Sequence, residues 1–248
     1  MGLFDKKFCS VCGQKIGLFG NRKLEDGNLC KECASKLSYW FSERRQATVE
    51  QIKEQLAYRE ENLEKVKAFH TTKTLGRANL ICFDENAKRF MVQRTKNALT
   101  ENPDVIDYSA VTGVDIDVDE DKDEIMTEDA EGKKVSYNPP RYEYGYNFTA
   151  IIRVNHPYFS EMEVKLNPST VSIEQVTIPG KPSIAPVRHP EYMQYEKMGK
   201  EIKETLTAVQ EAAAEEARPK RPVKCPLCGA ITVPDENGKC EYCGSVIE

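Results

Sequence analysis

The sequence is poor in histidine and has no long apolar segment. Only three of its 248 residues are histidines, His70, His156 and His189, and the last two each stand directly before a proline. Catalysis needs acid, base or nucleophilic groups that converge. These histidines give no sign of such a set, so we expect the protein not to be an enzyme. No apolar run approaches the ~20 residues that a membrane-spanning helix needs, so we expect no transmembrane segment.

The sequence also lacks a targeting signal and an excess of positive charge. Its opening residues MGLFDKKF contain no apolar stretch of signal-peptide length, and Lys6 stands where a myristoylation signal has Ser or Thr. The net charge of -5 disfavours sequence-independent binding to nucleic acid, because that binding depends on basic surface. Because no targeting signal is evident, we expect a cytoplasmic protein. Since 30% of the residues are charged, we also expect a modest core with long solvated elements.

Cysteine is abundant and regularly spaced. Eight of the nine cysteines form four Cys-x-x-Cys pairs, and only Cys82 stands alone. We interpret Cys82, which lies in an apolar stretch with no evident base, as a buried structural thiol. In a reducing compartment, paired cysteines of this kind are metal ligands rather than disulfides. The paired residues are Cys9, Cys12, Cys30, Cys33, Cys225, Cys228, Cys240 and Cys243.

Each end of the chain therefore carries a four-cysteine metal site. Zn²⁺ prefers a tetrahedron of ligands, and two Cys-x-x-Cys turns supply two thiolates each, so the sequence predicts two Zn²⁺ per chain. Iron stays an alternative in either site, because it accepts the same thiolate tetrahedron. Short β segments before a helix predict a treble-clef-like zinc finger over residues 1–47. Residues 219–248 predict a zinc ribbon, which is too short to fold without the metal. We call these two segments the zinc modules.

Two helical patterns flank the middle of the chain. Residues 48–72 predict a charged linker helix that begins at Thr48, with Gln51 completing a capping box. Its narrow apolar stripe, which Arg59 interrupts, either packs on the protein's own core or forms a coiled-coil seam with a second copy. Residues 190–218 predict an amphipathic helix, followed by a basic linker with two prolines. The stripe of the first helix is Ile52, Leu56, Leu63 and Val66.

Residues 73–180 have the pattern of an antiparallel β domain. The stretch 141–155 alternates aromatic and aliphatic residues with polar ones, which is the strongest strand signal in the sequence. Asp84-Glu85-Asn86 separates two apolar runs, as a hairpin turn does. About seven strands in roughly a hundred residues predict a small barrel or sandwich, and the whole chain is then of the α+β class. The alternating residues are Tyr142, Tyr144, Tyr146, Phe148, Ala150, Ile152 and Val154.

One acidic series needs a separate interpretation. Its spacing is that of a calcium-binding loop, but Lys122 stands where that loop requires glycine, and the preceding pattern is a strand rather than a helix. We therefore interpret the series as an acidic, solvated strand edge that runs into a loop. The series is Asp117, Asp119, Asp121 and Glu128.

Two segments resemble known families. The stretch FCSVCGQKIGLFGNRKLEDGNLCKECASKLSYWFSERRQATVEQIKEQLAYREEN resembles a bacterial family, the domain of unknown function numbered 4428, in which a four-cysteine domain runs into a charged helix. The four family cysteines match Cys9, Cys12, Cys30 and Cys33. Residues 73–180 resemble, more loosely, the pleckstrin-homology-like (PH-like) and GRAM-like domains of bacteria. In those domains a hairpin is followed by a strand that begins with a sequence similar to VIDYSAVTGVDI, and a helix closes the barrel. The resemblance implies zinc binding and no known reaction, and it offers no catalytic residues.

These observations leave three classes of function. The first is a non-enzymatic zinc-binding adaptor that binds protein partners, with self-association through the helices as an option. The second is binding to anionic lipid at the inner face of the membrane through a basic hairpin. The third is nucleic-acid binding by the zinc modules, which the overall acidity disfavours. The hairpin cations are Lys88, Arg89, Arg94 and Lys96, and the zinc modules offer Arg22, Lys23, Lys220, Arg221 and Lys224.

Overall fold

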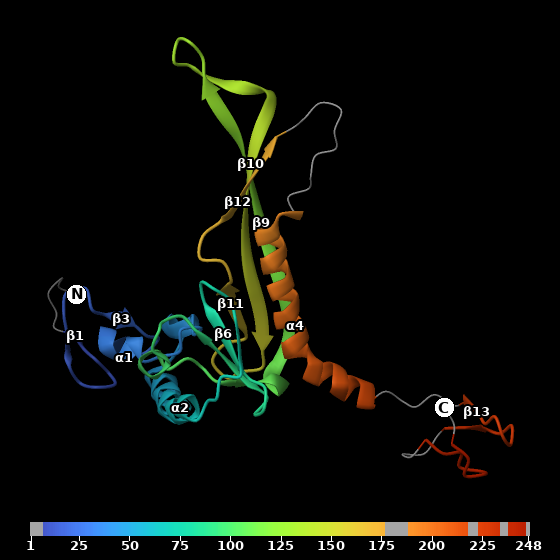
Figure 1. Cartoon of the computed structure of the whole chain (residues 1–248). Helices are drawn as coiled ribbons and strands as arrows, with labels where there is room; N and C mark the ends of the chain where they lie inside the picture. Colours follow the sequence, from blue (N-terminus) through green and yellow to red (C-terminus); the bar gives the residue numbers. More distant parts are fainter. Residues whose placement is uncertain (1–6, 177–187, 218–222, 234–237, 247–248) are drawn as a thin grey trace. The chain divides into compact units, whose positions relative to one another are not determined.

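The computed structural model describes residues 7–176, 188–217, 223–233 and 238–246 (Figure 1). These residues belong to two compact units, one within residues 1–207 and the other within 208–248. No helix in the described part of the chain is long and apolar enough to cross a membrane.

The first unit begins with two short β-hairpins and a short helix around the first cysteine quartet. Leu24 and Leu29 of this segment are fully buried and belong to one apolar cluster with Ile52 of the following helix. Cys30 caps the short helix, because its Sγ accepts a hydrogen bond from the backbone N–H of Cys33. The second cysteine pair thus opens a helix, as predicted. The elements are β1 (Lys7–Phe8), β2 (Lys15–Ile16), β3 (Arg22–Lys23), β4 (Asn28–Leu29), α1 (Lys31–Ser35) and the 3-10 helix η1 (Glu43–Arg45).

Helix α2 (Val49–Lys67) begins at the predicted capping box. Thr48 Oγ1 accepts a hydrogen bond from the Gln51 N–H at 3.3 Å, and Gln51 Oε1 accepts one from the Thr48 N–H at 2.9 Å. The buried face differs from the predicted apolar stripe, because Leu56 and Leu63 are only half-buried while three polar side chains lie inside. This face packs within the chain itself, so it is not free to form a coiled-coil seam. Its buried residues are Ile52, Gln55, Arg59, Asn62 and Val66.

The first of two larger sheets contains four short antiparallel strands in the order β5-β6-β7-β8. The predicted hairpin is present, since β6 pairs with β7 through a turn that Asp84 and Arg89 close. Phe83 and Phe90, which face each other in this hairpin, are fully buried. The elements of this region are β5 (Lys73–Leu75), β6 (Leu80–Asp84), β7 (Arg89–Gln93), α3 (Ala98–Glu101), β8 (Ile106–Asp107) and the 3-10 helix η2 (Tyr108–Ala110).

Strand β10 is the centre of the second sheet. It pairs along one edge with β9 and along the other with β12 and β11. The predicted alternation is confirmed from Tyr146 to Val154, where every second side chain is buried, whereas Tyr142 and Tyr144 are half-buried. The strands are β9 (Val111–Glu128), β10 (Lys134–Val154), β11 (Glu161–Lys165) and β12 (Val171–Val176).

The strands do not close into the predicted PH-like barrel. The described residues form several small antiparallel sheets, so the fold is mixed α and β without a closed barrel. The 21 residues of β10 make a long hairpin with β9 (Figure 1). A closed barrel needs a partner on both sides of every strand, and among the described strands β9 pairs with β10 alone.

The N-terminal part of helix α4 (Pro190–Ala217) packs on the second sheet (Figure 1). Tyr192 contacts Tyr146 and Phe148 edge-on, with ring centroids 4.8 and 5.1 Å apart. Tyr195 stacks on Phe148 at 5.5 Å. The predicted amphipathic helix therefore forms, and its aromatic residues cover the apolar face of β10.

The second unit contains the C-terminal cysteine quartet. Its strands β13 (Val223–Lys224) and β14 (Ile231–Thr232) pair antiparallel. A single antiparallel bridge joins Lys239 to Val246. The predicted basic linker with its two prolines lies outside the described residues.

Candidate metal centres

The first quartet gathers four thiols at one point. Its first turn is held by two backbone hydrogen bonds, from Cys9 N to Gln14 O at 2.8 Å and from Gly13 N to Cys9 O at 2.9 Å. Gly13 has a φ of 73°, a conformation that glycine adopts without steric cost. All four Sγ atoms lie within 4.8 Å of one another in the quartet of Cys9, Cys12, Cys30 and Cys33.

Backbone N–H groups point at the sulfur atoms of this quartet. The N–H of Cys30 donates to Cys9 Sγ at 3.4 Å, and that of Cys33 donates to Cys30 Sγ at 3.3 Å. Burial raises the pKa of the Cys9 thiol, but the backbone donors outweigh it and lower this pKa to about 6. Burial and the neighbouring thiols raise the pKa of Cys33. The backbone donors therefore favour a thiolate at Cys9, and further thiolates beside it need a cation.

The C-terminal quartet repeats this local geometry. Gly229 and Gly244 follow the two cysteine pairs with φ values of 75° and 70°. Their N–H groups donate to Cys225 O and Cys240 O at 2.9 and 2.8 Å. All four Sγ atoms again lie within 4.8 Å of one another in the quartet of Cys225, Cys228, Cys240 and Cys243.

Ser245 is a neighbour of the second quartet that the cysteine pattern does not reveal. Its Oγ lies 3.3 Å from Cys225 Sγ and 3.1 Å from Cys243 Sγ. The backbone N–H of Cys228 and the Ser245 hydroxyl lower the pKa of Cys225 to about 6. The sequence signal for Ser245 is its position directly after a Cys-x-x-Cys-Gly turn. This position brings it back to the turn, where the Ser245 carbonyl accepts a hydrogen bond from Cys240 N at 2.8 Å.

Both quartets fit a tetrahedral metal ion. The Sγ atoms are 3.7 Å apart for Cys12 and Cys30, and 3.6 Å apart for Cys225 and Cys243. A tetrahedron with Zn–S bonds of ~2.3 Å has an edge of ~3.8 Å, so these distances suit zinc with four thiolate ligands. Such a site has every coordination position filled by the protein, and its role is to hold chain segments together.

The N-terminal quartet has a counterpart in a known family. Residues 7–55 match the model of a domain of unknown function (DUF4428). The DUF4428 segment contains all four cysteines of the first quartet, η1 and the first turns of α2, and it leaves the second quartet outside. No curated protein and no solved structure matches the chain. The PH-like resemblance of residues 73–180 thus gains no support from these comparisons.

The four hairpin cations do not form one basic patch. Two lie where the turn meets the start of β7 and two follow its C-terminal end, about 17 Å away at ~3.3 Å per strand residue. Arg89 pairs with Asp84 at 3.4 Å. Arg94 pairs with Glu101 at 3.1 Å. Both arginines are therefore neutralised within the chain, and two lysines at opposite ends of β7 remain for lipid. The cations at the turn are Lys88 and Arg89, and those after β7 are Arg94 and Lys96.

The five basic residues that the sequence analysis names in the zinc modules lie only partly within the described part of the chain. Arg22 donates to a backbone carbonyl of its own module at 3.3 Å, and Lys23 is exposed. Lys224 is exposed in the second unit. Lys220 and Arg221 lie outside the described residues. Nucleic-acid binding by the modules stays a prediction.

The acidic series lies on a strand, as predicted, but it does not run into a loop, because β9 continues to Glu128. Asp117, Asp119 and Asp121 lie on β9, each paired with a residue of β10, so they are spread along a strand instead of gathered in a loop. In the described ranges, the clusters that could hold a metal are the two cysteine quartets. Cys82 is 4% exposed, and burial raises the pKa of its thiol, which suits a structural role.

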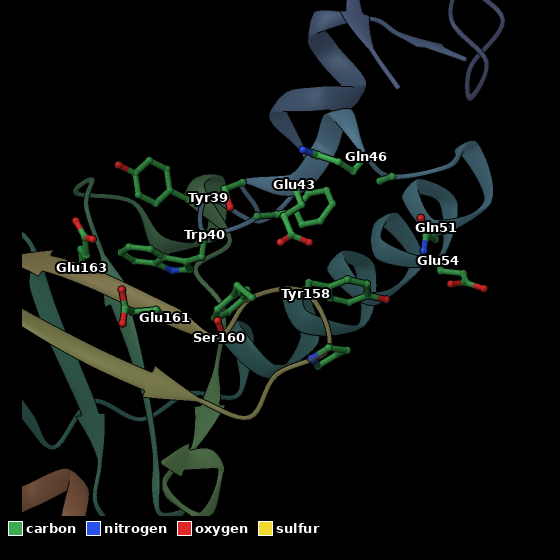
Figure 2. A pocket seen from close by; sticks show the side chains of 15 residues that line it. Tyr39, Trp40, Glu43, Gln46, Gln51, Glu54, Tyr158, Ser160, Glu161 and Glu163 are labelled. Atoms are coloured by element: carbon green, nitrogen blue, oxygen red, sulfur yellow. The ribbon is translucent and has the colours of Figure 1, made fainter. Parts of the chain in front are cut away.

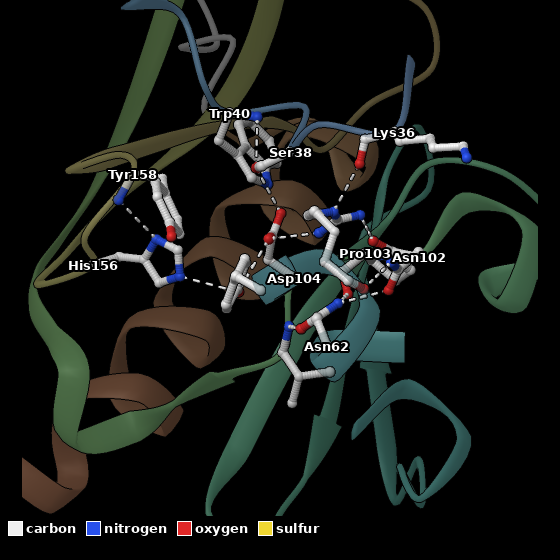
Figure 3. Close-up of polar contacts among 12 residues, drawn as sticks. Lys36, Ser38, Trp40, Asn62, Asn102, Pro103, Asp104, His156 and Tyr158 are labelled. Carbon is white, nitrogen blue, oxygen red and sulfur yellow. Dashed lines mark hydrogen bonds and ion pairs between the residues drawn. The ribbon is translucent and has the colours of Figure 1, made fainter. Parts of the chain in front are cut away.

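A buried polar network centred on Asp104 is a feature that the hydrophobic pattern does not reveal (Figure 3). Asp104 Oδ1 accepts from Arg59 Nη1 at 2.7 Å and from Tyr58 Oη at 3.2 Å. Asp104 Oδ2 accepts from Ser38 Oγ at 2.8 Å. Tyr58 Oη also lies 3.0 Å from His156 Nε2. The network joins Ser38, which lies before α2 in the DUF4428 segment, to the later turns of α2, to the loop before β8 and to the loop after β10. The interruption of the apolar stripe by Arg59 is the signal that could have found it.

Proposed function

We propose that this chain is a non-enzymatic, zinc-binding adaptor that binds protein partners through its two zinc modules. The observation that carries the proposal is the four-thiolate geometry of both quartets, whose Sγ atoms lie within 4.8 Å of one another. Zinc would organise a treble-clef-like finger and a zinc ribbon, in which the metal replaces the large core that such short segments lack. A reducing compartment such as the cytoplasm keeps the thiols available to the metal.

Exposed apolar side chains on both modules support a role in protein binding. Leu18 and Phe19 of the finger are 82% and 89% exposed, and Leu227 and Tyr242 of the ribbon are 75% and 71% exposed. The ribbon pair occupies equivalent positions, each directly before the second cysteine of its Cys-x-x-Cys turn. Large apolar groups that contribute nothing to the module's own core are typical of interaction surfaces.

Affinity purification of the tagged chain from its native host, with cross-linking and mass spectrometry, tests the adaptor function. Wild type should enrich a reproducible set of proteins over a tag-only control. Leu227→Ser/Tyr242→Ser should lose the partners of the ribbon and keep its zinc, because it removes apolar surface and no ligand. Leu18→Ser/Phe19→Ser is the matched variant for the finger. If wild type enriches nothing beyond the tag-only control, the adaptor proposal is wrong.

A further inference from the structure

A groove lined by aromatic and acidic side chains lies in the first unit (Figure 2). It has a volume of about 910 Å³ and is formed by residues 39–47, by α2 and by residues 157–163, which run into β11. Five of its fifteen lining residues are aromatic and four are glutamates, whereas none is a lysine, arginine or histidine. The groove therefore combines aromatic rings with negative charge, and none of its lining residues carries a positive charge.

Tyr39, Trp40 and Tyr158 are aromatic residues of the groove that a cation can reach, whereas Phe159 is buried. Tyr39 is 61% exposed, and its ring lies 4.9 Å from that of the half-buried Trp40. Arg94 lies over the Tyr39 ring at 3.4 Å from its centroid, so the chain itself places a guanidinium group on one of these rings. Tyr158 lies across the groove from Trp40 (Figure 2). Burial, with the charges of Glu54 and Glu61, raises the pKa of Tyr158. Ring faces of this kind attract cations.

Most glutamates of the groove are not neutralised by the chain. Glu161 pairs with Arg153 at 3.4 Å, but Glu43, Glu54 and Glu163 form no ion pair with a described residue. These three belong to η1, α2 and β11 respectively, so they approach the groove from different elements. A ligand with several positive charges could pair with more than one of them at once.

We propose that this groove binds an extended, lysine- or arginine-rich segment of a partner protein. One cationic side chain lies between the rings of Trp40 and Tyr158, and neighbouring cations pair with the three free carboxylates. The charge of the lining selects this occupant, because the phosphates of lipids and nucleic acids would meet three glutamates without an ion pair, and no lining residue is a lysine, arginine or histidine. The volume suits several side chains rather than one small ion. The inference rests on the adaptor function proposed above and names the class of partner.

Trp40 gives a direct measurement of this binding, because it is the chain's single tryptophan. Titration of the zinc-loaded full chain with an oligolysine or oligoarginine peptide should change Trp40 fluorescence in a saturable way. Added salt should weaken the binding, since the carboxylates of the groove are exposed. An oligoglutamate peptide of the same length should produce no change.

Charge-matched variants separate the groove from general attraction to an acidic protein. Glu43→Gln/Glu54→Gln/Glu163→Gln should weaken oligolysine binding about tenfold or more, because it removes three charge-assisted contacts. A control variant with the same change in net charge should alter the affinity by less than about twofold. An equal loss in both variants, or no response of Trp40 to the peptide, overturns the inference. The control replaces the exposed residues Glu60, Glu124 and Glu196 by Gln.

The groove inference and the adaptor proposal would be contradicted by different measurements. If wild type enriches no host protein, the adaptor proposal fails whatever the peptide does. If wild type and the groove variant enrich the same proteins, and oligolysine leaves Trp40 unchanged, the adaptor function stands and the groove inference is wrong.

Discussion

Arg59 Nη1 lies 2.7 Å from Asp104 Oδ1, and the two side chains are only 6% and 2% exposed. The pair joins α2 to the loop between α3 and β8. Arg59 also donates to Lys36 O at 3.2 Å and to Asn102 O, so its guanidinium group contacts two separate segments, the stretch after α1 and the loop between α3 and β8. Loss of either partner of such a pair is costly, because the other charge stays buried without compensation.

Arg59→Met should lower the free energy of unfolding by about 3–5 kcal/mol, because it leaves the Asp104 carboxylate buried without its cation. Asp104→Leu should cost a similar amount, and the double variant should cost less than the sum of the two. Urea unfolding followed by Trp40 fluorescence measures all three. The exposed pair of Lys67 and Glu64 supplies the control, since Lys67→Met should change stability by less than about 0.5 kcal/mol. Strictly additive effects would contradict the coupling.

His156 is held in its neutral form by its surroundings. It stacks on Phe159 with ring centroids 4.1 Å apart. Burial lowers the pKa of His156, and the positive charges of Lys65 and Arg59 lower it further, while Asp104 opposes the shift. The protonated imidazolium is therefore disfavoured in the folded chain.

The direction of the pH dependence follows from that lowered pKa. Unfolded His156 takes up a proton near its ordinary pKa of 6.5, whereas folded His156 does so only at lower pH. The unfolded state binds more protons in between, so the free energy of unfolding should fall as the pH drops below about 7. His156→Gln keeps a hydrogen-bonding group without the titration and should flatten this slope.

Stability measured from neutral to mildly acidic pH, with zinc content determined at each point, checks the role of His156. The N–H of Ala87 is the main cause of a lowered pKa at Asp84. The stability that Asp84 contributes is lost only below its ordinary pKa of 3.8, so it does not affect the slope in this pH range. Equal slopes for wild type and His156→Gln would show that the histidine is not the group responsible.

The parts of this fold that the sequence reveals are those set by local spacing. The Cys-x-x-Cys-Gly turns, the capping box of Thr48 and Gln51, and the alternation from Tyr146 to Val154 each depend on residues that are close in the chain. Local hydrogen bonds and the two-residue period of a strand determine them. These predictions therefore required no knowledge of long-range contacts.

The parts that the sequence does not reveal depend on distant partners. Asn62 donates to Asn102 Oδ1, and Arg59 pairs with Asp104, across separations of 40 and 45 positions. Helical periodicity treats such polar residues as solvent-facing, so it finds Ile52 and Val66 but misses the polar part of the buried face of α2. Alternation likewise shows which face of β10 is apolar but not which strands pair with it, so the long β9 ladder and the open sheets could not be predicted. The aromatic groove has the same origin, because it joins residues 39–47 to residues 157–163.

The lipid hypothesis makes a prediction about vesicles of phosphatidylglycerol. We expect wild type to stay in solution at low salt, because Arg89 and Arg94 are paired within the chain and the net charge is -5. Each remaining lysine would contribute only about 1 kcal/mol near an anionic surface. Co-sedimentation measures the binding, with Lys88→Glu/Lys96→Glu as the matched variant. Pelleting of wild type but not of this variant would show that the basic hairpin does bind lipid.

The two zinc modules differ in how they connect to the rest of the chain. Cys30 and Cys33 belong to the same buried cluster as Leu24, Leu29 and Ile52. The second quartet lies in a separate compact unit. Loss of a ligand in the first module should therefore disturb the first unit, whereas loss of one in the second should not.

Cys33→Ser and Cys228→Ser form a matched pair that tests this difference. Wild type purified without chelator should contain about two zinc atoms per chain by elemental analysis, and each variant about one. Cys33→Ser should move the urea transition of Trp40 to lower urea, because a structural metal site supplies folding free energy. Cys228→Ser should leave that transition unchanged, because Trp40 lies in the first unit. Fewer than about one and a half zinc atoms in wild type would contradict the two-site assignment. A lowered Trp40 transition in Cys228→Ser would show that the C-terminal module does not fold separately.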